Sequence, residues 1–140
     1  MSIESIQSKI RGYDREIEAL SAEIRELIKE MDRVVEAQSQ VTRKEKDFHN
    51  YLDRERGLAT KMKTNERVKV AVGFGNRMNT IITGTKYRSA MSSIDGIKRT
   101  LTRRKSDIES RIAQCRRRIT SLQDSIRNSS LQIAKLSEVK

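Results

Sequence analysis

Two long stretches of the chain, residues 3–63 and 86–138, place hydrophobic side chains at alternating steps of three and four. This spacing is the a/d pattern of a coiled coil, in which a narrow apolar seam of one helix faces another helix. No proline interrupts either stretch, and proline is the residue that most strongly breaks a helix. The pattern predicts two long helices, with Ser2 as the N-cap of the first.

The stretch between them, residues 64–85, does not follow the pattern and holds Gly73, Gly75 and Gly84, half of the six glycines. We expect an irregular apex loop there. The two helices have nearly equal lengths, which favours a single domain over residues 1–140, folded as an antiparallel two-helix hairpin. Folding at the middle of the loop would place opposite each other seam residues whose numbers add to roughly 145–150. The predicted fold class is therefore all-α.

The apex has two further interpretations. Val68, Val70, Val72 and Phe74 alternate as in a strand, and residues 80–83 supply a second short strand for a small β-hairpin. Residues 65–72 equally fit the last turns of the first helix, and a helix followed by a loop is favoured. Two helices cannot easily bury the apolar residues of this stretch. We expect it to be loose in the isolated protein and ordered when a partner binds.

Charged residues interrupt both seams. Glu45 falls on the first seam, and Lys98 and Lys105 fall on the second. We expect Glu45 to face the region of the two lysines and to fix the register of the hairpin, as polar seam residues can. The alternative is that these long side chains extend to the edge of a thin seam without a partner.

The apolar stripe is wider than a two-helix seam requires. Hydrophobic residues flank both seams and occupy the apex, which suggests contact with more than one other helix. We expect self-association into a bundle, as in a homodimer, or binding to other helical chains. The candidate partner-binding residues are Ile28, Val35, Phe74, Ile81, Ile97 and Leu131.

Composition supports long helices rather than a globular core. Hydrophobic residues make up 35% of the chain and charged residues another 35%. Disorder is the competing interpretation at this charge content, but the regular seam argues against it. The formal net charge is +11, and residues 63–140 carry 18 Lys and Arg against only 6 Asp and Glu. This half of the chain should meet an acidic protein, a nucleic acid or an anionic lipid surface.

A basic face on the second helix is the main argument for nucleic acid, because basic coiled-coil hairpins can grip RNA backbones. The chain has only two Phe and three Tyr, however, and base-stacking aromatics are typical of such proteins. A solvated face, balanced partly by acids of the first helix, explains the same residues. We keep nucleic acid as the alternative and prefer a protein partner. The basic face comprises Arg103, Arg104, Arg116, Arg117 and Arg118.

No residue pattern predicts catalysis, a metal site or a cofactor site. His49 is the only histidine and has no companion ligands, so we interpret it as a surface residue. Cys115, the only cysteine, falls on the seam and should be a small buried residue. Gly73-Phe74-Gly75 lacks the Gly-Lys-Ser/Thr ending of a phosphate-binding loop. We therefore expect a protein that is not an enzyme.

The N-terminal residues lack the basic and apolar regions of a secretory signal peptide, and no apolar run is long enough to span a membrane. We expect a cytoplasmic protein. If it leaves the cell, the export signal would be read on the folded protein or carried by a partner.

The assembled pattern resembles the WXG-type, or Esx-like, helical-hairpin proteins of the type VII secretion system. In that family a Trp-x-Gly loop precedes the second helix, and here Ile82-Thr83-Gly84 stands at that place. The longer accessory proteins of LXG toxins are more similar and match nearly the whole chain. The resemblance implies a targeting factor or chaperone that binds the helical domain of an LXG toxin, a second small hairpin protein, or both.

The chain departs from the family in two ways. It has no Trp, and nothing after Tyr87 fits the Tyr-x-x-x-Asp/Glu export signal of the second helix. Residues 51–55 match that signal by letters, but they fall in the first predicted helix. The resemblance therefore implies an accessory chain whose partner supplies the signal, and which is exported, if at all, together with that partner.

Overall fold

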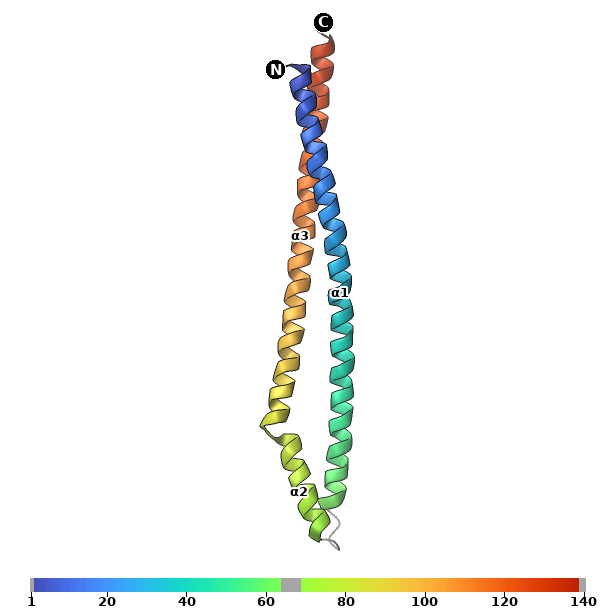
Figure 1. Ribbon diagram of the computed structural model, residues 1–140, viewed down its shortest axis with the longest axis vertical. Helices are drawn as coiled ribbons and strands as arrows, with labels where there is room; N and C mark the ends of the chain where they lie inside the picture. The colour runs from blue at the N-terminus through green and yellow to red at the C-terminus, as the bar shows by residue number, and fades with distance from the viewer. Residues whose placement is uncertain (1, 64–68, 139–140) are drawn as a thin grey trace. The chain divides into compact units, whose positions relative to one another are not determined.

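A computed structural model describes residues 2–63 and 69–138, and every regular element in those ranges is helical (Figure 1). The predicted all-α class is confirmed. The helices are α1 (Ile3–Lys63), α2 (Lys69–Thr83) and α3 (Thr85–Glu138).

The packing divides the chain into two compact units. The first unit combines Met1–Arg33 with Arg104–Lys140, and the second is Val34–Arg103. Within each unit α1 packs antiparallel against α3, as in a helical hairpin. Whether other chains complete a bundle stays a prediction, as does the single domain.

The core of the first unit consists of residues from the predicted seams. Ile6, Ile108, Cys115 and Leu122 are each 1% exposed. The burial of Cys115 agrees with its interpretation as a small core residue. At the start of α1 the backbone N–H of Ser5 donates to the Ser2 hydroxyl at 3.1 Å, so Ser2 is the N-cap that the sequence predicted.

The second unit contains a helix where the sequence predicted a loop. The apex-loop prediction is wrong for residues 69–83, and the β-hairpin alternative is wrong for them as well, because these residues form α2. Gly73 and Gly75 lie inside this helix, at a typical cost of about 1 kcal/mol each relative to alanine. Gly75 is nevertheless buried within the second unit, as is Ala59 near the end of α1.

Gly84 is the single bend between α2 and α3. The backbone N–H of Arg88 donates to the Gly84 carbonyl at 3.3 Å, so the first turn of α3 starts from this residue. Gly84 of the predicted turn motif therefore lies directly before α3, whereas residues 82–83 of the motif belong to α2 and not to a loop. The Ile82 side chain lies outside the described residues, as does Val68 of the proposed strand.

The register differs from the one expected. In the first unit Glu23 pairs with Arg111, and the numbers of the paired residues (23 and 111) add to 134 rather than 145–150. The stacked Phe48 and Tyr87 of the second unit, whose ring centroids are 5.8 Å apart, give nearly the same sum. The expectation failed because it placed the reversal at the middle of residues 64–85, whereas residues 69–83 of that stretch already form the helix α2.

Glu45 and Lys98 face each other across the seam of the second unit, as predicted. The Lys98 Nζ lies 3.1 Å from the Glu45 Oε2, and the Glu45 side chain is 21% exposed. The expected partner region is thus confirmed at one of its two lysines. That this pair fixes the register stays a prediction.

Replacing Glu45 with leucine tests the register role. The substitution should leave thermal stability equal or higher, because leucine suits a seam position, while α1 and α3 gain alternative registers. Amide NMR spectra should then show more than one set of signals. Val41→Leu, an apolar exchange at a neighbouring seam position, is the control and should keep one set. A more stable Glu45→Leu protein with a single set of signals would rule out the register role.

Candidate helix-docking surface

Three arginine–glutamate pairs join α1 to α3 along one flank of the first unit. The Arg111 Nε lies 2.6 Å from the Glu23 Oε1, and its Nη2 lies 2.9 Å from Oε2. Arg118 contacts both oxygens of Glu16 in the same way, at 2.9 and 3.2 Å. Arg104 contacts Glu30. These three pairs, here called the ion-pair ladder, repeat every seven residues on both helices.

The ladder occupies position g of the heptads, the residue directly before seam position a on each helix. In an antiparallel pair of helices the two g positions lie on the same flank, here called the g flank. The paired side chains are between one third and about one half exposed. Water therefore screens them, and each pair contributes little to the stability of the fold.

Pairing within the ladder changes the pKa of Glu23 and of two arginines. The Arg111 guanidinium, by donating hydrogen bonds to the Glu23 carboxylate, holds the pKa of Glu23 below its ordinary value of 4.5. The same bonds raise the pKa of Arg111, and the Glu16 carboxylate raises the pKa of Arg118. Burial raises the pKa of the Cys115 thiol above its ordinary value, which keeps the thiol protonated and unreactive at neutral pH.

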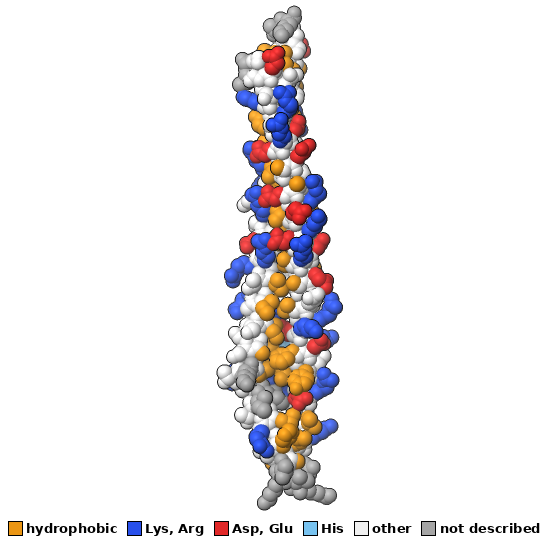
Figure 2. All heavy atoms as spheres, viewed as in Figure 1, with side chains coloured by type: hydrophobic (Ala, Val, Ile, Leu, Met, Phe, Trp, Pro, Cys, Tyr) orange, Lys and Arg blue, Asp and Glu red, His pale blue; other side chains and the backbone are white. Residues whose placement is uncertain are grey.

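On the same flank of the second unit, the g positions of both helices hold mostly apolar residues. The next g positions of α1 are Ala37, Lys44, Tyr51 and Leu58, and no acid is among them. The g positions of α3 there are Ile97 and Ala90. Tyr51, Leu58 and Ile97 are 53%, 44% and 50% exposed. Among its described residues, the g flank of the second unit therefore carries no ion pair between the helices, and it presents apolar surface to solvent. Figure 2 shows hydrophobic side chains gathered on a face of this unit.

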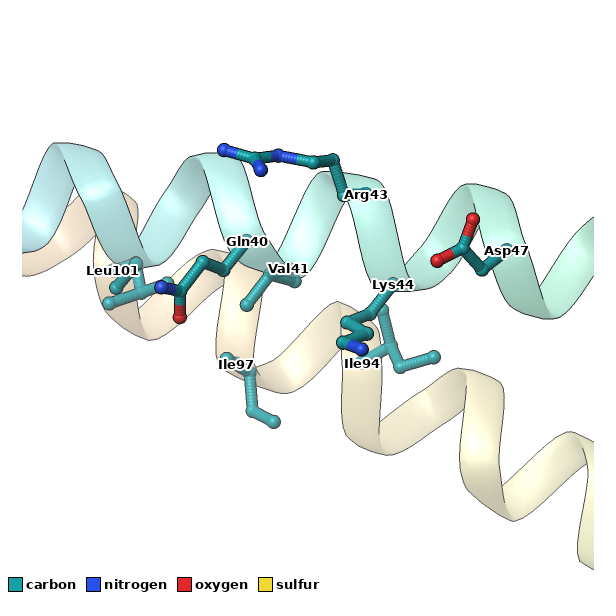
Figure 3. Close-up of a pocket in the computed structure, with 9 residues that line it drawn as sticks. Gln40, Val41, Arg43, Lys44, Asp47, Ile94, Ile97 and Leu101 are labelled. Atoms are coloured by element: carbon teal, nitrogen blue, oxygen red, sulfur yellow. The ribbon is translucent and has the colours of Figure 1, made fainter.

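A groove opens on the g flank of the second unit, between α1 and α3 (Figure 3). Its volume is about 630 Å³. In Figure 3 Lys44 and Gln40 extend from α1 toward α3, whereas Arg43 lies on the side of α1 away from α3. The groove therefore has an apolar floor with a cation at its edge. Its lining residues are Ala37, Gln40, Val41, Arg43, Lys44, Asp47, Ile94, Ile97 and Leu101.

The predicted partner-binding residues whose side chains are described are exposed and are divided between the two units. Ile28 and Leu131 belong to the first unit, and Val35, Phe74 and Ile97 to the second. Each is between 43% and 57% exposed, and the Ile81 side chain lies outside the described residues. Only Ile97 lines the groove. Their role in binding stays a prediction.

The sequence analysis missed the exposure of Tyr51 and Leu58 on the g flank. It also missed the residues that line the groove, except for Ile97. It counted apolar residues beside each seam without separating the two flanks. The signal that would have found them is the change along one heptad position, from Glu16, Glu23 and Glu30 to Ala37 and later apolar residues.

The predicted basic face divides into two groups. Arg104 and Arg118 belong to the ion-pair ladder, which the sequence analysis foresaw only as a partial balance by acids of the first helix. Arg103, Arg116 and Arg117 are exposed and make no ion pair with other described residues. Three arginines therefore stay available to an acidic partner.

The described part of the chain holds no cluster of His, Cys, Asp and Glu able to bind a metal ion, and His49 is exposed. None of its helices combines the length and apolar character needed to cross a membrane. Comparisons with protein families, with curated proteins and with solved structures gave no match to this chain. The geometry of the helices is therefore the basis for assigning a function.

The pair of Glu23 and Arg111 makes the stability of the fold depend on pH. The pKa of Glu23 is lower in the folded protein than in the unfolded chain, so its pairing stabilises the fold above the ordinary pKa of 4.5 and is lost as the pH falls through the lower folded pKa. Glu23→Gln should lower the melting temperature at neutral pH, and the difference from the native protein should disappear in acid. Circular dichroism melts across this range measure it. Glu18→Gln, an exposed acid outside the ladder, is the control. An equal loss in Glu23→Gln at every pH would contradict the prediction.

Proposed function

We propose that this protein is a non-enzymatic helical accessory protein that binds an LXG-type toxin, a second small helical partner, or both, as a targeting factor or chaperone for type VII export. The observation that carries the proposal is the exposed apolar surface on the g flank of the second unit. Tyr51, Leu58 and Ile97 on that flank are each about half exposed, although few hydrophobic side chains of the described chain are buried. Apolar residues that gather on one exposed face mark sites of protein interaction.

Two further features support this proposal over the alternatives. Gly84 stands at the start of α3, the place that the WXG-type hairpins give to their loop glycine. The chain also lacks the export signal of that family after Tyr87, which suits a chain exported only through its partner. The protein would then begin in the cytoplasm and leave, if at all, with its cargo.

Co-expression with the helical N-terminal domain of an LXG toxin from the same genome tests the proposal. We expect a complex of defined stoichiometry by analytical ultracentrifugation, with a melting temperature above that of either chain, because ligand binding to the folded state stabilises it. Deletion of this chain should also remove the toxin from the culture medium. The matched control is an LXG domain from a distant system. A toxin that is exported equally without this chain would contradict the proposal.

The basic surface should set the rate of association. The second unit carries 15 Lys and Arg against 7 Asp and Glu, a net charge of +8. Electrostatic steering speeds association more than it adds affinity, and salt screens it. Stopped-flow measurements should therefore show a rate constant for association that falls with salt while the dissociation rate changes little. Equal association rates at low and high salt would show that this surface does not steer the partner.

The second candidate function is binding of nucleic acid, and the observation in its favour is the group of exposed arginines Arg103, Arg116 and Arg117. A gel shift with random RNA and DNA at physiological salt separates the two functions. We expect only weak, salt-sensitive binding. Tight binding there would support the second candidate and contradict the chaperone function.

A further inference from the structure

We propose that the groove on the g flank of the second unit binds one amphipathic helix of a partner, and that this helix carries acidic residues beside its apolar stripe. The inference rests on the proposed function, because it takes a helical partner as given, and it names the site and the chemistry of that partner.

A helix fits this site because of how the groove is built. Two antiparallel helices leave a long shallow groove on each flank of their seam, and a third helix packs there by inserting side chains spaced as i, i+3, i+4 and i+7. In the first unit arginine–glutamate pairs bridge this flank. In the second unit the equivalent positions hold Ala37 and Ile97. These two apolar side chains form no ion pair across the flank, and they line the groove.

The groove is apolar where side chains of a partner would enter. Val41, Ile94 and Leu101 belong to the seam of the second unit, and each also lines the groove. A partner helix would therefore extend the existing seam rather than cover an unrelated patch. Burying this surface is favourable by about 25 cal/mol for each Å² of apolar area removed from water.

Charge selects the kind of helix. Lys44 extends over the groove from α1, and Asp47 is the only acid that lines it. The unit around it has a net charge of +8. An acidic flank on the partner helix would meet Lys44, and long-range attraction would bring it to this unit first.

The same charges disfavour a second copy of this chain as the occupant. A second copy brings another unit of charge +8, and the two would repel. Its ladder acids, Glu16, Glu23 and Glu30, are already paired with arginines of its own α3. The apolar floor, with Ile94 and Ile97, likewise suits a helix better than a phosphate backbone.

The probe for the groove is a synthetic amphipathic helix with leucine at its a and d positions, glutamate on both flanks and a fluorescent label. A twin peptide has lysine in place of each glutamate. Fluorescence anisotropy with the full chain at physiological salt measures both. We expect the acidic peptide to bind at least about tenfold more tightly than its basic twin. Equal binding of the two peptides would overturn the charge selection.

Two glutamate substitutions on α3 locate the site. Ile97→Glu places a charge in the groove and should weaken binding of the acidic peptide by about tenfold or more. Leu131→Glu makes the same change at an exposed apolar residue of the first unit and should leave binding unchanged. Lys44→Glu should weaken the acidic peptide and strengthen the basic one. Circular dichroism checks that each variant folds. Equal losses in Ile97→Glu and Leu131→Glu would overturn the assignment of the groove.

Two further measurements separate this inference from the proposed function. If the LXG domain binds native protein and Ile97→Glu equally well, the groove is not the docking site although the proposed function holds. If the LXG domain does not bind at all but the acidic peptide binds in an Ile97-dependent way, the groove is supported and the proposed function fails. Sedimentation of the chain alone gives the remaining outcome: self-association abolished by Ile97→Glu would make a second copy the occupant and overturn the acidic partner.

Discussion

The structure depends on one narrow apolar seam shared by α1 and α3. A seam of this kind buries one side of each helix and no more, so few side chains reach full burial: Ile6, Ile108 and Leu122 are among them. Everything beside the seam must either be solvated, be paired with a charge on the other helix, or be covered by another chain. Those three possibilities account for the differences between the two units.

Heptad position g has a different role in each unit. In the first unit the g positions hold glutamate on α1 and arginine on α3, and their side chains bridge the flank. In the second unit they hold Ala37 and Ile97, and the flank stays open as a groove. Within each unit α1 and α3 are antiparallel. The side chains at these positions therefore determine whether ion pairs bridge the flank or leave a groove.

Much of the fold was predictable because heptad spacing is a local signal. The limits of α1, the N-cap at Ser2 and the burial of Cys115 follow from local sequence and from positions in the repeat. The meeting of Glu45 with Lys98 needed one more assumption, that the chain folds back on itself as a hairpin. The apex was not predictable in the same way. Gly73 and Gly75 weaken a helix in isolation, so the local sequence did not indicate α2. Because α2 was missed, the register was also misplaced.

The sequence by itself determined that this chain forms long antiparallel helices with an apolar seam and an excess of positive charge, because periodicity and composition need no knowledge of neighbours. The tertiary structure decided which residue of α1 lies opposite which residue of α3. That pairing showed that Arg104, Arg111 and Arg118 are partly neutralised by acids of α1, and that Ile97 lines a groove. Register is a property of two segments together, so no reading of either helix alone could supply it.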